Sequence, residues 1–315
     1  MAWQLTVRLC ILLLSLVAAS VLIFLVVQVL PGDPAQVVLG VNATPEALAQ
    51  LRHQMGLDQP VYVRYVVWLA GLVRGDLGTS QVSGAPVADL VAQKLAVSVP
   101  LALLGTAVSV VIAVPLGVIA GVRYRRASGT VISALSLGGI AIPAFWGALL
   151  LITLFSIRLH VLPSGGFVAW SDDPAGAFRS LLLPAISLGL VQGAILTRYI
   201  RSAIVDVLRE DFIRTARAKG LTRWQALRRH GFRNAAIPVV TVLGLQLTSL
   251  LVGAIVIENV FFLPGLGRML FQAIGNRDLI VIQATVMLLT AVVLVVNFLV
   301  DVSYRLLDPR IRAAR

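Results

Sequence analysis

The sequence predicts an all-α polytopic membrane protein with six transmembrane helices. Mean hydropathy is +0.93, 58% of the 315 residues are hydrophobic and only 13% are charged. A soluble protein of this length carries about a quarter charged residues. Six charge-free runs are long enough for a bilayer whose hydrocarbon core of about 30 Å needs about 20 helical residues. These runs are Leu9–Gly32, Leu95–Val122, Ala127–Ile157, Ser180–Thr197, Asn234–Ile257 and Leu279–Val300.

The basic residues predict the orientation of these helices. The pieces 1–8, 123–126, 198–233 and 301–315 hold 18 of the 26 Lys and Arg residues and a net charge of +13, against −1 on the other side. Because basic residues favour the cytoplasmic side, we expect a plasma-membrane protein with both termini in the cytoplasm. The excess of 24 Arg over 2 Lys indicates a GC-rich bacterial genome, so the membrane is expected to be bacterial. The same topology explains the pI near 11.2, so the charge does not indicate nucleic acid as a partner.

The first run is expected to be a retained helix. Its apolar core, Leu9–Leu30, is longer than the 7–15 residues of a signal-peptide core. We therefore divide the chain into an N-terminal transmembrane helix at 1–32, an extracytoplasmic loop at 33–94, and a five-helix core at 95–315 that includes a cytoplasmic loop at 198–233. Cys10 is the only cysteine, which excludes an intrachain disulfide.

Two short helices are predicted in the extracytoplasmic loop. Thr44 followed by Pro45 is a typical helix start, and Gly56 is placed to end that helix. The second stretch, Val61–Val73, is amphipathic and rich in aromatic residues, which suits the membrane interface. The loop is thus a lid on the lipid surface, a docking face for an external protein, or both.

Small and polar residues inside the runs have two interpretations each. Glycines and prolines permit close helix packing or serve as gating kinks. Polar side chains form interhelical hydrogen bonds or line a translocation path. No ionisable residue lies deep in any run, which disfavours an ion-driven carrier. The candidate path residues are Gln192, Gln246, Ser249, Gly253 and Asn297, and the candidate packing residues are Pro115, Gly117, Gly138, Gly139 and Pro143.

The cytoplasmic loop has the most specific local pattern. From Ala203 to Lys219 there is no Pro or Gly, so we expect an unbroken helix, and Gly220 suits the positive φ of a helix end. Thr222 with Gln225 predicts a capping box.

A short basic helix is then expected over Arg223–His230, closed by Gly231. Its apolar strip consists of Leu221, Trp224 and Leu227. The loop is either a topology signal that touches anionic lipid or a socket for a cytoplasmic partner.

The run Arg-Thr-Ala-Arg-Ala-Lys-Gly at 214–220, with Arg229-His230, Arg233-Asn234 and Ile237-Pro238, resembles the conserved cytoplasmic loop of ABC importer permeases of the dipeptide/oligopeptide/nickel family. Arg214 stands where other subfamilies carry Glu. The runs at 30–34, 55–60 and 75–80 resemble the B-type subunit of that family. The connection Glu258–Arg268, the triplet 276–278 and the run 307–312 are also similar, so the resemblance covers essentially the whole chain.

The resemblance implies a type I ABC importer permease fold and transport of dipeptides or oligopeptides. It also implies four kinds of partner: a C-type permease subunit, two ABC ATPase subunits, an extracytoplasmic substrate-binding protein and membrane lipid. ATP and Mg would be bound by the ATPases, with no cofactor in this chain. The residues implied in ATPase coupling are Arg214, Thr215, Ala216, Arg217, Ala218, Lys219, Gly220, Leu221, Trp224, Leu227, Arg229, His230, Arg233 and Asn234.

Other chemistry finds no support in the sequence. There is no Gly-x-x-x-x-Gly-Lys-Ser/Thr phosphate loop. His53, His160 and His230 are too far apart to form a metal site together, and no catalytic arrangement is visible. We therefore expect no catalytic residues and no metal. The alternatives are an ATP-independent channel or facilitative carrier and, in third place, a membrane-embedded enzyme.

Overall fold

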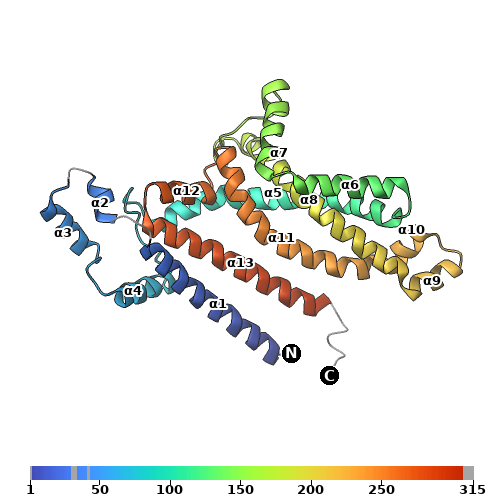
Figure 1. Cartoon of the computed structure of the whole chain (residues 1–315), viewed down its shortest axis with the longest axis horizontal. Helices are drawn as coiled ribbons and strands as arrows, with labels where there is room; N and C mark the ends of the chain where they lie inside the picture. Colours follow the sequence, from blue (N-terminus) through green and yellow to red (C-terminus); the bar gives the residue numbers. More distant parts are fainter. Residues whose placement is uncertain (1, 30–33, 41–42, 308–315) are drawn as a thin grey trace. The chain divides into compact units, whose positions relative to one another are not determined.

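A computed structural model of the chain describes residues 2–29, 34–40 and 43–307, so all but the last residue of the family-like run at 30–34 and all but the first residue of the run at 307–312 lie outside it. The described residues are almost entirely helical (Figure 1). The elements are α1 Ala2–Val29, α2 Pro34–Leu39, α3 Pro45–Gln54, α4 Val61–Val73, α5 Val87–Val122, α6 Ala127–Ala141, α7 Ala144–Leu151, the π-helical η1 Ile152–Arg158, α8 Pro174–Arg209, α9 Asp211–Ala218, α10 Arg223–Ala226, the π-helical η2 Leu227–Gly231, α11 Phe232–Val260, α12 Leu266–Gly275 and α13 Leu279–Leu307.

Five helices of the described part are long and apolar enough to cross a membrane. They contain the second, fourth, fifth and sixth predicted runs and the described part of the first. The third run, Ala127–Ile157, is predicted as one span but is not one straight helix. It forms two helical pieces, α6 and α7–η1, that meet at an angle of 99° (Figure 1). The span count is six only if this bent pair crosses the membrane as one broken span.

The bend follows from Pro143. The residue before a proline is pushed out of the helical region by the proline ring, and Ile142 accordingly has ψ of 120°. Pro115 and Pro184, in contrast, lie inside continuous helices. A proline in this chain therefore allows a helix to end but does not require it, and the packing around the proline decides between the two outcomes.

The chain divides into two compact units. Unit 1 consists of Met1–Ser98 and Pro264–Val295, and unit 2 consists of Val99–Leu263 and Val296–Arg315. Each unit has its own apolar core. The short helices predicted in the extracytoplasmic loop are confirmed in unit 1: Thr44 caps α3 by accepting a hydrogen bond from the Ala47 N–H (3.3 Å).

Unit 2 is built around α8. In the apolar 18-residue stretch of α8 that could cross a membrane, 67% of the residues are buried, against 28% in the equivalent stretch of α5. Helices α6, α7 and α11 pack on α8, and α5 approaches it through glycines. A Cβ on Gly117 would lie 2.6 Å from the Cβ of Ile200, and one on Gly189 would lie 2.4 Å from Val108 Cγ1. Such small residues let two membrane helices come close enough for backbone contact.

Gly117→Ala is expected to lower the stability of unit 2. The added methyl has no room against Ile200, and overpacking a tight interface costs about 1–3 kcal/mol. Thermal unfolding of the purified protein in mild detergent measures the loss. Gly138→Ala is the matched control, because no heavy atom lies within 4 Å of the position its Cβ would take. Equal melting temperatures for the two variants would contradict the packing argument.

Candidate functional site

The loop at 198–233 begins with a break that was not predicted from the sequence. The expected unbroken helix from Ala203 to Lys219 is interrupted at Glu210, which has ψ of 146° and separates α8 from α9. The break brings Ile213 and Ala216 of α9 into the same apolar cluster as α8. Burial of these two residues thus overrides the local preference for a continuous helix.

A charge signal marks this break in the sequence. Arg209 lies in the last turn of α8 and Asp211 in the first turn of α9. Cations stabilise helix C-termini and anions stabilise helix N-termini. The reversal from Arg209 to Glu210-Asp211 is therefore the pattern expected for one helix ending and another beginning.

Helix α9 ends in the turn expected at Gly220, which has φ of +92°. The Gly220 N–H donates to the Arg217 carbonyl (3.0 Å) and the Leu221 N–H donates to the Ala216 carbonyl (3.3 Å). These two bonds form a complete Schellman motif. Leu221 and Ala216 also meet in the apolar cluster, which is the hydrophobic contact that accompanies this motif. The turn direction is thus fixed by both backbone and packing.

The predicted capping box is also confirmed. The Thr222 side chain accepts from the Gln225 N–H (3.3 Å), and the Gln225 Oε1 accepts from the Thr222 N–H (2.9 Å). Both bonds satisfy backbone donors that the first turn of α10 would otherwise leave unpaired.

The expected helix end at Gly231 is wrong. Helix α10 passes through the π-type turn η2 directly into α11, and Gly231 has a helical φ of −101°. Gly231 is needed for a different reason: a Cβ there would lie 2.8 Å from Leu227 Cδ1 and 2.9 Å from Val207 Cγ1. The short helix and the following span therefore form one continuous rod.

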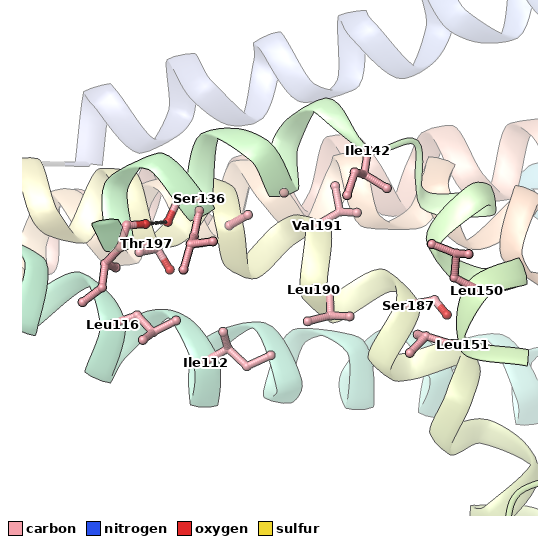
Figure 2. A pocket seen from close by; sticks show the side chains of 15 residues that line it. Ile112, Leu116, Ser136, Ile142, Leu150, Leu151, Ser187, Leu190, Val191 and Thr197 are labelled. Carbon is pink, nitrogen blue, oxygen red and sulfur yellow. Dashed lines mark hydrogen bonds between the residues drawn. The ribbon is translucent and has the colours of Figure 1, made fainter. Parts of the chain in front are cut away.

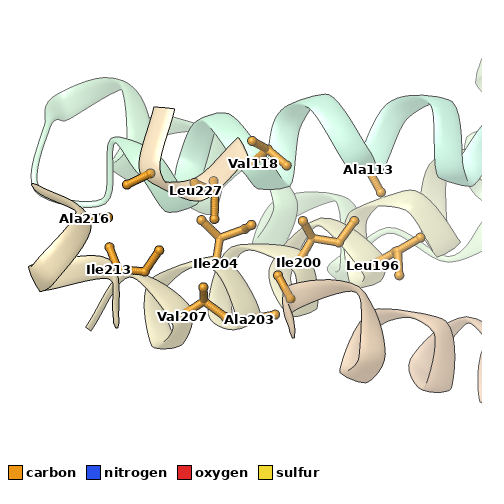
Figure 3. Packing of buried hydrophobic residues seen from close by; sticks show 12 residues of the cluster. Ala113, Val118, Leu196, Ile200, Ala203, Ile204, Val207, Ile213, Ala216 and Leu227 are labelled. Carbon is orange, nitrogen blue, oxygen red and sulfur yellow. The ribbon is translucent and has the colours of Figure 1, made fainter. Parts of the chain in front are cut away.

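The loop is anchored to unit 2 through a cluster of buried residues that Figure 3 shows. Ile213 and Leu227 are both 0% exposed. Their side chains point among those of α8, with Ile204 between them and Val118 of α5 nearby. Full burial of an aliphatic side chain contributes about 1.5–3 kcal/mol. The loop is thus part of the helical core and follows the helices if they move.

The opposite face of the loop remains exposed. The Arg214 guanidinium pairs with Asp211 at 3.1 Å, but both groups are well exposed, so the pair contributes little to stability. Of the residues implied in coupling, Ala216 and Leu227 are buried and Leu221 is half-buried. The exposed ones are Arg214, Thr215, Arg217, Ala218, Lys219, Gly220, Trp224, Arg229, His230, Arg233 and Asn234.

Trp224 lies at the border between the buried and the exposed face of the loop. It is 46% exposed, and its ring meets that of Phe232 edge-on with centroids 5.9 Å apart. Both rings border a groove of 520 Å³ against α5, whose lining is apolar except for Arg123. The predicted apolar strip is therefore divided: Leu227 serves the core, and Trp224 is open to a partner or to lipid.

The candidate path residues are brought together only in part. Gln192 and Gln246 are buried, and Gln246 Nε2 donates to the Gln192 carbonyl (3.1 Å) across the α8–α11 contact. The side-chain oxygens of both, and of the half-buried Asn297, have no hydrogen-bond partner in the described structure. Ser249 is exposed, and a Cβ on Gly253 would lie 3.3 Å from Leu188 Cδ2.

An apolar cavity of 380 Å³ lies between α5, α6, α7 and α8 (Figure 2). Its lining is hydrocarbon apart from three hydroxyl groups. Those of Ser136, Ser187 and Thr197 donate to backbone carbonyls four residues earlier in their own helices, at 2.7–2.9 Å. The cavity therefore offers a peptide no unused hydroxyl donor, and it suits apolar groups.

Buried ionisable groups are scarce in unit 2. Glu258, in the last turn of α11, is 1% exposed. The sequence places it just outside the fifth apolar run, and its burial follows from the fold. Within the described ranges, no group of three His, Cys, Asp or Glu residues could hold a metal ion.

A helical bundle with five or six spans and a capped basic loop fixed to its core defines a multi-pass membrane permease. The chain belongs to the family of binding-protein-dependent transport system inner membrane components. The profile of that family matches residues 113–313, and the profile of its N-terminal part matches residues 1–102.

Two named relatives agree with this assignment. The chain is 42% identical over 293 residues to a putative peptide transport system permease protein of Brucella abortus (strain 2308), covering 93% of each chain. It is 40% identical over 298 residues to the glutathione transport system permease protein GsiC of Escherichia coli (strain K12), covering 95% of each. The protein is therefore a membrane-spanning pore subunit of an ABC importer. Nothing in these comparisons supports an ATP-independent channel or carrier.

Proposed function

We propose that this permease imports dipeptides, oligopeptides or related peptide-like compounds and that its 214–234 loop couples ATP-driven closure of the ATPases to alternating access. The peptide substrate is supported by the names of the relatives, one a peptide permease and one a glutathione permease. Both termini and the loop would lie in the cytoplasm, as the charge distribution indicates.

The observation that carries the coupling role is the two-sided construction of the loop. Leu227 and Ile213 are fully buried in the helical cluster, while the basic residues from Arg214 to Lys219 stay exposed. A segment that only attracted anionic lipid would need charge alone. A segment that transmits force needs a rigid attachment as well, and the Schellman turn, the capping box and the buried leucine supply it.

The partners follow from this mechanism. One chain supplies one loop, so a homologous C-type permease would supply the second, and each loop would contact one of two ABC ATPase subunits that bind ATP and Mg. An extracytoplasmic binding protein would deliver the substrate. This chain would hold no cofactor and catalyse no reaction itself. The bond between Gln246 and the Gln192 carbonyl would join α8 and α11 beside the path, with Ser249, Gly253 and Asn297 as further candidates.

Gly220→Val is expected to uncouple transport while membrane insertion stays intact. Gly220 has φ of +92° and no heavy atom within 4 Å of the position its Cβ would take, so the substitution acts on the backbone alone. A β-branched residue in this conformation costs about 1 kcal/mol or more. We expect reduced peptide uptake per ATP hydrolysed by the importer in proteoliposomes.

Gly220→Asn is the matched control, because asparagine tolerates the left-handed region, and it should keep most of the uptake. The proposal fails if Gly220→Val imports peptide as the wild type does. It also fails if both variants lose uptake equally, since the backbone conformation would then not be the cause.

A further inference from the structure

Unit 1 contains a pocket of its own on the side that the sequence assigns to the exterior. Its volume is 410 Å³, within the range of about 300–1,000 Å³ that is usual for small-molecule sites. The end of α1, the α3–α4 connection, α4, the turn before α5 and the start of α13 line it. The lining mixes aromatic, amide and charged side chains, in contrast to the hydrocarbon lining of the cavity in unit 2.

One wall of this pocket is held by an aromatic cluster. The ring of Phe24 in α1 lies 5.4 Å from that of Tyr65 and 5.8 Å from that of Trp68, both in α4. The hydroxyl of Ser20 lies 2.9 Å from the Tyr65 hydroxyl and forms a hydrogen bond with it. Aromatic pairs at these distances contribute about 0.5–1.5 kcal/mol beyond their burial, so α4 is fixed against α1.

Arg64, on the same helix, lines the pocket and is half-buried. Its guanidinium forms no ion pair or hydrogen bond with any residue that the structure describes, so its charge has no counter-ion among them. Removal from water lowers the pKa of its guanidinium from its usual value, which is the expected effect of desolvating a charge. Asp76 also lines the pocket, but its carboxylate accepts from the Gly78 N–H (2.8 Å) and does not pair with Arg64.

Gln81 supplies a second unsatisfied group. Its backbone N–H donates to Asp278 (3.3 Å), which fixes the residue in place. Its side-chain Oε1 is buried and has no hydrogen-bond partner in the described structure. A buried acceptor left unpaired costs about 1–3 kcal/mol, so this oxygen favours a ligand that brings an N–H group.

We propose that this pocket binds the free carboxylate of a peptide-like molecule through Arg64, while Gln81 Oε1 accepts an N–H from the same molecule. A guanidinium suits this role because its planar array of donors matches both oxygens of a carboxylate. The inference rests on the proposed function, since the ligand would be the transported compound on its way into the permease. The pocket would thus give the permease a selectivity of its own, in addition to that of the binding protein.

Labelling with a photoreactive tripeptide tests the proposal. The probe is trialanine with a benzophenone group on its N-terminus, in two forms that differ only in a free C-terminal carboxylate or its amide. Each form is irradiated with the complete importer in lipid nanodiscs without ATP, and labelled residues are mapped by mass spectrometry. We expect the free acid to label residues 54–81, and the amide to label them about tenfold less, because a charge-assisted bond is lost.

Variants assign the effect to particular groups. Arg64→Gln should reduce labelling by the free acid about tenfold, and Arg64→Lys should restore part of it by returning the charge. Gln81→Leu should weaken labelling by both forms, since it removes only the N–H acceptor. Arg74→Gln is the control, because Arg74 is exposed at the end of the same helix and does not line the pocket.

Three results would overturn the proposal: equal labelling by acid and amide, no labelling of the pocket, or unchanged labelling in Arg64→Gln. In the last case, weaker binding of the empty substrate-binding protein to the variant would show that Arg64 contacts that protein. ATP-driven uptake of trialanine by the wild type is measured separately. If the pocket labels as expected but no uptake occurs, the proposed function fails while the carboxylate site stands.

Discussion

Leu227→Ala is expected to destabilise unit 2 by about 2–5 kcal/mol, the range found when a buried leucine is truncated. Leu227 is fully buried in the cluster that joins α8 and α9. Its Cδ1 lies only 2.8 Å from the position that a Cβ on Gly231 would take, so the side chain is tightly packed there. The cavity left behind would loosen the 214–234 loop from the helices. We therefore expect a lower unfolding temperature in detergent together with ATP hydrolysis that no longer drives substrate uptake.

Leu137→Ala provides the comparison for this variant. Leu137 lies in α6 and is 59% exposed, so the same truncation removes few protein contacts and should leave both stability and uptake close to wild type. If Leu227→Ala lowers the unfolding temperature but uptake per ATP is unchanged, the anchoring of the loop has no part in coupling.

Asp278→Ala is expected to be the most damaging single substitution in unit 1. It should lower the free energy of unfolding by about 2–4 kcal/mol, because it removes a helix cap and buried hydrogen bonds to a charged acceptor. The carboxylate is 4% exposed. It accepts hydrogen bonds from the Ser80 hydroxyl, the Gln81 N–H and the Val281 N–H. It thereby caps α13 and ties that helix to a turn almost two hundred residues earlier. Thermal unfolding and limited proteolysis between residues 74 and 86 would report the loss.

Asp278→Asn separates the effect of charge from that of shape. The amide keeps an acceptor oxygen at nearly the same place, so it should recover part of the stability that alanine loses. Asp58→Ala, at an exposed turn of the same unit, should change little. An unfolding temperature for Asp278→Ala equal to that of Asp58→Ala would refute the role assigned to this carboxylate.

Two features of the 214–234 loop could be predicted from the sequence because each depends only on residues a few positions apart. The Gly220 turn needs only a residue free to adopt positive φ, and the capping box needs only Thr222 and Gln225 three positions apart. Both are decided by neighbours along the chain. The same holds for α4, whose observed bounds Val61–Val73 match the predicted stretch.

The features that escaped prediction depend on distant contacts. Gly231 looked like a helix end, yet it is a site of close approach to Val207. Glu210 interrupts a run that has no helix breaker, because Ile213 gains burial by folding back. The pocket around Arg64 joins segments from both ends of the sequence, so no window of the chain contains its pattern.

The continuity of α10, η2 and α11 has a mechanical consequence. The stretch Arg223–Val260 contains 38 residues, so at about 1.5 Å per residue it is a rod roughly 57 Å long. Because no break separates α10 from α11, a tilt imposed at Trp224 would be passed on directly to α11. On the other side of the loop, the extended residue Glu210 interrupts the backbone between α8 and α9, but Ile213 and Leu227 are buried among residues of α8. The load would therefore be shared: α11 would receive it through the backbone, and α8 would receive it through packed side chains.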